Sequence, residues 1–252
     1  MTTTERVHVT TDAGPMPADL LRPDAGSGGA DAGSRPSPGA GPARAGIVVV
    51  QEIFGVTGYV LDRAADLAAL GYTVLVPHLF WRSGDEVVEG GGQAELARAM
   101  ELAGATDWAG AVSDTREALA HLRGLVGDGS VGLLGFCWGG GVAFDAASRE
   151  VDAVDALVAY YGSALPALLD RAPEVTAPSL HHWGTEDTFI PVEQVDLIEA
   201  AVARDGVRLV RHPGAGHAFD NPLPEFHHAR ASADAWATTT DWLAGTLAAG
   251  RS

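Results

Sequence analysis

The chain has 252 residues, 46% of them hydrophobic, which suits one α/β domain with a sizeable core. Its formal net charge of -17 at pH 7 argues against nucleic acid and against an anionic membrane surface as partners. The N-terminal residues show no basic stretch followed by an apolar one, and no apolar run is long enough for a membrane span. We therefore expect a cytoplasmic protein, with no signal in the sequence for a particular oligomeric state.

The N-terminal part of the chain predicts a β-hairpin followed by a long insertion. Residues 6–11 and 16–22 have the pattern of two strands joined by a turn. Residues 23–44 are almost entirely Gly, Ala, Pro, Ser and Asp, and this composition buries too little apolar surface to offset the entropy of ordering. We expect a disordered loop there. Because predicted strands flank it, we interpret it as an insertion within a single domain that spans residues 1–252.

A β-α-β unit comes next. Residues 46–50 and 72–77 are continuous apolar runs typical of buried parallel strands, and a helical pattern over residues 60–70 lies between them. The aromatic segment 78–85 follows the second strand, at a position where α/β folds place ligands. The glycines at 90–92 lack the spacing of a dinucleotide-binding loop, so they do not predict a nucleotide site.

The rest of the chain alternates strands and helices. Further strands are predicted over residues 131–135, 154–161, 179–183 and 207–212, and further helices over about 93–103, 108–125, 192–203 and 226–249. Such alternation predicts a mostly parallel sheet with helices on both faces, connected by right-handed crossovers.

A sharp turn between a strand and a helix contains the only cysteine of the chain. The segment Gly135-Phe136-Cys137-Trp138-Gly139 has the spacing of a G-x-S-x-G nucleophile elbow, with Cys in place of Ser. In an elbow the nucleophile lies on a strained turn, and the glycines leave room for neighbouring backbone. The alternative is a structural cysteine buried at a strand end.

Two other loops at predicted strand ends carry an acid and a base. Asp187 and His217 follow Cys137 in the chain order nucleophile, acid, base, which is the order found in α/β-hydrolases. His217 would take the thiol proton and return one to the leaving group, and Asp187 would set the tautomer of the imidazole. Taken singly, Asp187 fits a helix cap or turn and His217 a loop histidine. Their joint order and positions favour a triad.

Glu52 directly follows the predicted strand 46–50, where a carboxylate is costly unless it has a partner. We expect it beside the Cys137 thiol as a second proton acceptor, and the alternative is an ordinary surface carboxylate. The backbone N–H groups of Ile53 and Trp138 are candidates for an oxyanion hole, since α/β-hydrolases use the residue after the nucleophile and an early loop.

Five motifs together resemble the dienelactone hydrolase family, and they cover nearly the whole chain except residues 23–44. They are Gln51-Glu52-Ile53-Phe54-Gly55, Gly135-Phe136-Cys137-Trp138-Gly139-Gly140, Tyr160-Tyr161-Gly162, residues 184–191 and Gly216-His217-Ala218-Phe219. The resemblance implies an α/β-hydrolase fold, a Cys-His-Asp triad and hydrolysis of a carboxylate-bearing enol lactone such as dienelactone. We therefore expect a thiol hydrolase of small lactones or esters. The resemblance implies no cofactor, and it implies that Glu52 lies against the thiol.

The resemblance also implies two arginines that hold the substrate carboxylate. Arg82 matches the first, and a guanidinium can bind both oxygens of a carboxylate. The second position holds Asn221, which offers a hydrogen bond without charge, and Asp220 before it would repel an anion. Phe54 and Trp81 complete the expected substrate-binding residues. The reaction class of the family therefore transfers to this chain more securely than its substrate.

A non-catalytic small-molecule-binding protein on the same fold is the main alternative. Its pocket would be lined by Phe54, Phe80, Trp81 and Trp138. A redox sensor built on Cys137 would lack a resolving cysteine in the chain. The histidine pairs at 181–182 and 227–228 lack the spacing of zinc ligands, so we predict no metal site.

Overall fold

The structure, a computed structural model, describes residues 3–23, 45–149 and 154–248. Within these ranges, eight strands form one sheet in the order β1-β2-β4-β3-β5-β6-β7-β8. Neighbouring strands from β4 to β8 are parallel, whereas β1 and β2 add an antiparallel hairpin at one edge. This mostly parallel sheet with its covering helices confirms the expected α/β-hydrolase fold.

The elements have the following bounds. The strands are β1 (Thr3–Thr11), β2 (Gly14–Arg22), β3 (Gly46–Val50), β4 (Thr73–Pro77), β5 (Val131–Phe136), β6 (Ala156–Tyr160), β7 (Ser179–Gly184) and β8 (Val207–His212). The α-helices are α1 (Gly58–Ala69), α2 (Gln93–Ala105), α3 (Trp108–Val126), α4 (Trp138–Arg149), α5 (Val192–Val202) and α6 (Ala229–Ala248). Three short 3-10 helices are η1 (Trp81–Ser83), η2 (Leu165–Ala167) and η3 (Leu169–Glu174).

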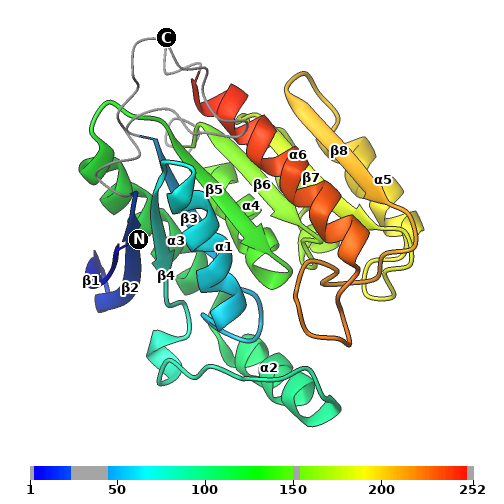
Figure 1. The fold of residues 1–252 in the computed structure, drawn as a ribbon, viewed down its shortest axis with the longest axis horizontal. Helices are drawn as coiled ribbons and strands as arrows, with labels where there is room; N and C mark the ends of the chain where they lie inside the picture. The colour runs from blue at the N-terminus through cyan, green and yellow to red at the C-terminus, as the bar shows by residue number, and fades with distance from the viewer. Residues whose placement is uncertain (1–2, 24–44, 150–153, 249–252) are drawn as a thin grey trace.

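Helices cover both faces of the sheet (Figure 1). Helices α1 and α6 lie over the face turned to the viewer, and α3, α4 and α5 lie behind it. Every residue of β3, β5, β6 and β7 is buried, because a parallel sheet between two helix layers has no face open to solvent. The continuous apolar runs that predicted these strands therefore form the core of the protein.

The last helix begins later than the sequence predicts. Its expected start was Phe226, but α6 begins at Ala229. The Phe226 N–H donates to the carbonyl of Leu223 at 2.9 Å in a turn, and His228 Nδ1 accepts the N–H of Ala231 at 3.1 Å. The imidazole of His228 therefore caps a helix that begins three residues after Phe226, and Phe226 stays in a loop that lines the site described below.

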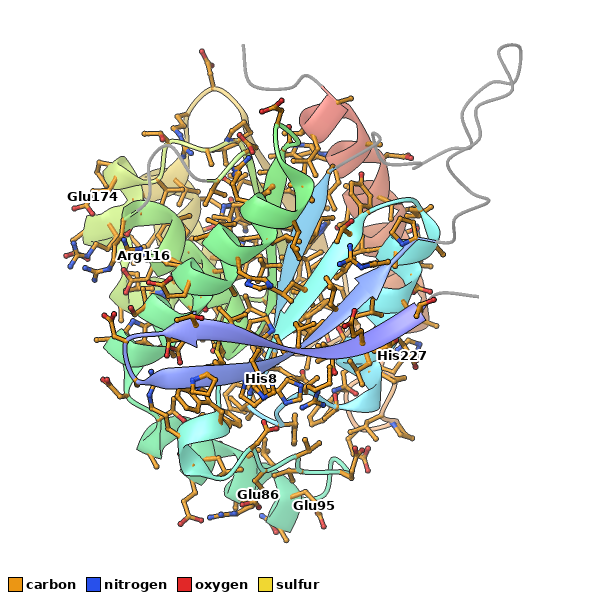
Figure 2. All side chains as sticks on the ribbon, turned by 90° about the vertical axis from the view of Figure 1, so that its left-hand side faces the viewer. His8, Glu86, Glu95, Arg116, Glu174 and His227 are labelled. Carbon is orange, nitrogen blue, oxygen red and sulfur yellow. The ribbon has the colours of Figure 1, made fainter. Side chains whose placement is uncertain are left out.

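A buried histidine connects the β1-β2 hairpin to the loop that follows β4. Figure 2 looks onto this hairpin, with His8 labelled on β1. His78 follows β4, and its Nε2 lies 2.9 Å from Asp19 on β2 while its Nδ1 lies 2.8 Å from Asp85. Arg6 on β1 donates to the same Asp19 at 2.8 Å. The His78 imidazole thus bridges β2 and the loop at Asp85, and β1 joins the same group of contacts through Arg6 and Asp19.

Two further expectations from the sequence are a disordered loop and the lack of a membrane span. The disordered loop predicted at 23–44 lies, from residue 24 onward, outside the described residues. No helix in the described part of the chain combines the length and the apolar character that crossing a membrane requires.

Candidate active site

The carboxyl ends of the parallel strands bring the expected chemical residues to one edge of the sheet. Cys137 directly follows β5, Glu52 follows β3, Asp187 follows β7 and His217 follows β8. Parallel strands end at a common edge, so residues far apart in the chain meet there. Helix α2 lies beyond this edge, at the bottom of Figure 1.

Cys137 lies at the tip of the turn between β5 and α4. Its φ of 53° is in the left-handed region, which is unfavourable for a residue with a side chain. The backbone around it holds this conformation: the Cys137 N–H donates to the carbonyl of Tyr160 at 3.0 Å, and its own carbonyl accepts from Ser163 N–H at 3.1 Å. The turn therefore has the strained geometry that a nucleophile elbow predicts.

The glycines on either side of Cys137 are required by close backbone approaches. A Cβ on Gly135 would lie 2.2 Å from the carbonyl oxygen of Gly139, and a Cβ on Gly139 would lie 2.2 Å from the carbonyl oxygen of Gln51. Both obstacles are backbone atoms, which cannot rotate away as a side chain can. Glycine at 135 therefore lets β5 approach the first turn of α4, and glycine at 139 lets that turn pack against the end of β3.

We expect Gly139→Ala to lower the free energy of unfolding by about 3 kcal/mol or more, because the added methyl group has no space to enter. Gly124→Ala in α3 is the matched control, since no atom lies within 4 Å of the Cβ it would add. That change should stabilise the protein by about 0.5–1 kcal/mol. Urea unfolding followed by circular dichroism measures both variants. A Gly139→Ala protein as stable as the wild type would contradict the steric argument.

The thiol, the imidazole and the carboxylate form a continuous chain of contacts. His217 Nε2 lies 3.1 Å from Cys137 Sγ, and His217 Nδ1 lies 2.7 Å from Asp187 Oδ2. Asp187 is itself held by its other oxygen, which accepts the N–H groups of Phe189 at 2.8 Å and Ile190 at 2.9 Å. An ionised carboxylate can only accept, so His217 donates from Nδ1 and presents Nε2 to the sulfur.

The surroundings of His217 favour its protonated form. Burial alone would lower its pKa, but the Cys137 sulfur and the Asp187 carboxylate outweigh burial and raise the pKa to about 10. A protonated imidazole stabilises a neighbouring thiolate, which is the reactive form of cysteine. The geometry can therefore hold a sulfur anion beside an imidazolium.

Glu52 is buried at the same edge, with its carboxylate turned toward Asn221. The side chain of Asn221 donates from Nδ2 to Glu52 Oε1 at 2.7 Å, and its Oδ1 accepts the N–H of Leu223 at 3.0 Å. Burial raises the pKa of Glu52 to about 7, and the hydrogen bond from Asn221 opposes part of that rise. The alternative of an ordinary surface carboxylate is wrong, because Glu52 is 1% exposed.

A cavity of about 120 Å³ opens over the thiol. Four polar residues face it, and they are Glu52, Cys137, Ser163 and His217. The other lining residues are apolar, and they are Ile53, Phe54, Leu96, Met100, Phe189, Ala218 and Phe226. The sulfur, the imidazole and the buried carboxylate thus share one small and largely apolar space.

The dienelactone hydrolase family model matches residues 36–247. The chain belongs to the dienelactone hydrolase family. Carboxymethylenebutenolidase 1 of Cupriavidus pinatubonensis is 30% identical over 201 residues, which are 79% of this chain and 85% of that protein. The carboxymethylenebutenolidase of Pseudomonas putida is 33% identical over 201 residues, which are 79% of this chain and 84% of that protein.

Solved structures agree with this assignment. A crystal structure from Klebsiella pneumoniae, provisionally described as a dienelactone hydrolase, superposes with a TM-score of 0.78 and 27% sequence identity. The match covers 97% of this chain and 99% of that one. As a member of the dienelactone hydrolase family, the protein is a lactone or ester hydrolase. The family and the hydrolase activity predicted from the sequence are both confirmed.

In this dienelactone hydrolase family member, the structure does not bring every expected substrate-binding residue to the cavity. Phe54 lines it, whereas Arg82 and Trp81 lie on η1 and contact Asp114 on α3. Arg82 Nη2 donates to Asp114 at 2.9 Å, its Nη1 also contacts that carboxylate, and its guanidinium lies 4.5 Å from the Trp81 ring centroid. The ion pair and the stacking fix Arg82 against Asp114 and Trp81, and it is not among the residues that line the cavity. Its role in binding a substrate carboxylate stays a prediction.

The charge expected at Asp220 is compensated inside the protein. Its carboxylate accepts from Arg63 Nη2 at 2.7 Å, from the Tyr59 hydroxyl at 2.7 Å and from the Ser232 hydroxyl at 2.7 Å. The Tyr59 hydroxyl also lies 3.2 Å from the Tyr161 hydroxyl. The Tyr161 ring packs against the His217 imidazole, with 5.2 Å between the two ring centroids. Asp220 therefore belongs to a buried network behind the site and does not face the cavity as an isolated anion.

Sequence reasoning missed several residues of the cavity. Ser163 lies with its hydroxyl 3.7 Å from Cys137 Sγ, directly after the motif Tyr160-Tyr161-Gly162. The motif itself was the only signal for it. Leu96 and Met100 come from α2, where their spacing of four residues along one helix face was an available signal.

A second cavity, of about 130 Å³, shares Glu52 and Phe54 with the first. Asn221, Thr57 and Tyr59 are among its other lining residues, so Asn221 lines this second cavity and not the one over the thiol. Among the residues that the structure describes, no three His, Cys, Asp or Glu side chains are grouped so that they could hold a metal ion.

Proposed function

We propose that this protein hydrolyses small carboxylic esters or lactones through a thioester formed on Cys137, with His217 as acid and base and Asp187 as its orienting carboxylate. The observation that carries the proposal is the chain of contacts from Sγ through the imidazole to the carboxylate, which ends at a small cavity. Relatives named carboxymethylenebutenolidase support an ester or lactone as substrate.

Acylation begins with the Cys137 proton on His217. The thiolate attacks the carbonyl carbon, a C–S bond forms, and the carbonyl π electrons move onto oxygen. When the tetrahedral intermediate collapses, the C–O bond breaks and His217 Nε2–H protonates the departing oxygen. The products are a thioester on Cys137, an alcohol or enol, and a neutral His217. In a lactone the hydroxyl stays attached to the acyl group.

Deacylation repeats the same proton movements with water. Neutral His217 takes a proton from water as the water oxygen attacks the thioester carbonyl. Collapse of the second intermediate breaks the C–S bond, releases the carboxylic acid and restores the sulfur and imidazolium. Asp187 keeps Nδ1–H oriented throughout, because its hydrogen bonds to two backbone N–H groups fix its own position.

The oxyanion is assigned to the backbone N–H groups of Ile53 and Trp138. Trp138 is the first residue of α4, so its N–H has no acceptor within the helix and lies at the positive end of the helix dipole. Ile53 lines the cavity from the loop after β3. Donors placed where charge develops are typically worth about 100- to 1000-fold in rate.

Trapping the acyl-enzyme tests the proposal. We expect 4-nitrophenyl butyrate to add the mass of one butyryl group to the protein in a rapid acid quench, and neutral hydroxylamine to remove it. Because Cys137 is the only cysteine, one labile adduct identifies the residue. Peptide mapping by mass spectrometry locates the label, and Cys137→Ala is the control. Turnover with the label on another residue, or with no adduct dependent on Cys137, would overturn the proposal.

A further inference from the structure

We infer that the substrate of this site is an uncharged, apolar ester or lactone, and that the site selects against substrates that carry a carboxylate near the reacting carbonyl. This inference rests on the proposed function and names its substrate class. It starts from the walls of the cavity over Cys137, where the residues other than the reacting groups, Glu52 and Ser163 are apolar.

Within the described part of the chain no arginine lines that cavity, and its one basic group is the His217 imidazole. The sequence contains no lysine, so any positive partner for a substrate carboxylate must be arginine or a protonated histidine. Arg82 is bound to Asp114, and Arg63 is bound to Asp220 at 2.7 Å. The imidazole of His217 faces the thiol and Asp187. Among the residues that the structure describes, a bound carboxylate would therefore find no arginine in the cavity and no histidine free of other partners.

The one further ionisable group in the cavity is an acid. Glu52 faces it and receives a single hydrogen bond from a neutral amide, Asn221. Among the described residues, no arginine is bonded to this carboxylate in the way that Arg63 is bonded to Asp220. An anionic substrate would lose its hydration in an apolar space and would also lie beside a carboxylate, and both effects disfavour it.

The size and the mouth of the cavity fit a small apolar group. An engineered apolar cavity of about 150 Å³ in another protein binds benzene, so the 120 Å³ here suits about four or five non-hydrogen atoms. Met100 on α2 and Phe189 after β7 line it while remaining 54% and 55% exposed, so the apolar surface continues to the outside. Glu95, at the bottom of Figure 2, adds negative charge on α2, whereas the charge of Glu86 is compensated by Arg98 at 2.6 Å.

Two enol lactones that differ in one group test the inference. They are 5-ethylidenefuran-2-one, which is neutral, and 5-carboxymethylidenefuran-2-one, in which a carboxylate replaces the methyl group. Each kcat/KM is divided by the hydroxide-catalysed rate constant of the same lactone, which removes the difference in intrinsic reactivity. We expect the corrected ratio to favour the neutral lactone by at least about 100-fold.

A positive charge placed at the mouth of the cavity should weaken the preference for the neutral lactone. Met100→Arg supplies a guanidinium at an exposed position and should shift the ratio toward the carboxylated lactone by about 10-fold or more. Met100→Gln is the matched neutral control and should leave the ratio within about 3-fold of the wild type. Arg82→Ala should change both rates by the same factor, because its guanidinium contacts Asp114 and not the substrate.

The outcomes separate this inference from the function on which it rests. A wild-type protein that hydrolyses the carboxylated lactone as well as the neutral one overturns the inference while the thioester proposal stands. A loss confined to the carboxylated lactone in Arg82→Ala also overturns it, because that result would place Arg82 on the substrate. If neither lactone nor 4-nitrophenyl butyrate is hydrolysed, the proposed function fails and the inference fails with it.

Discussion

Cys137→Ala is expected to lower kcat/KM for 4-nitrophenyl butyrate by at least about 10,000-fold, because the Cys137 sulfur is the group that contacts His217 Nε2 in the cavity. Cys137→Ser should retain little of the activity. A hydroxyl is a much weaker acid than a thiol, so the imidazole that shares a proton with sulfur at 3.1 Å cannot ionise the serine to the same extent. Steady-state kinetics at several enzyme concentrations measure both variants.

Asp187→Asn provides the matched test of the orienting role. The side chain keeps its size, but an amide group would face His217 Nδ1, where the carboxylate accepts at 2.7 Å. The imidazole would then favour the wrong tautomer, and we expect a loss of about 1000- to 10,000-fold in kcat. Urea midpoints should show that the variants remain folded. Activity within 10-fold of the wild type in Cys137→Ala or Asp187→Asn would contradict the assigned roles.

Glu52→Gln is expected to stabilise the protein by about 3 kcal/mol at pH 8. Burial raises the pKa of Glu52 from 4.5 to about 7, so the folded protein holds this proton more tightly than the unfolded chain. Between these two pKa values the unfolded state binds fewer protons, and stability falls as the pH rises. Above pH 7 the ionised, buried Glu52 lowers the free energy of unfolding by the full amount, which is about 1.4 kcal/mol for each unit by which its pKa is raised. Glutamine carries no charge and keeps an acceptor for Asn221.

The sign of the pH dependence is the decisive part of this experiment. The gain from Glu52→Gln should shrink toward zero as the pH falls to about 4.5, because the wild-type carboxyl is then protonated in both states. Urea unfolding of both proteins at pH 5 and pH 8 measures the gain in stability at each pH. Subtracting one gain from the other removes any effect of the amide that does not depend on pH. Glu193→Gln on the exposed start of α5 is the control and should show little change at either pH. A gain that is equal at both pH values would show that Glu52 does not carry a buried charge.

The fold was predictable because its signals are local or periodic. Continuous apolar runs at β3 and β5 indicate strands buried on both faces, and glycines around Cys137 indicate a tight turn. The start of α6 was missed because its cap is the side chain of His228, which only a particular rotamer brings to the helix end. Propensity alone carries no information on that rotamer.

Local sequence patterns are enough to predict the strand-turn-helix elbow, the order of Cys137, Asp187 and His217, and the common edge at which parallel strands end. The pairing of the remaining polar groups depends on how the folded segments pack. Arg82 has 33 acidic residues as possible partners in the chain, and packing of η1 on α3 selects Asp114. Asn221 meets Glu52 across 169 positions. Such contacts depend on where folded segments touch, and that is a property of the packed molecule and not of any stretch of sequence.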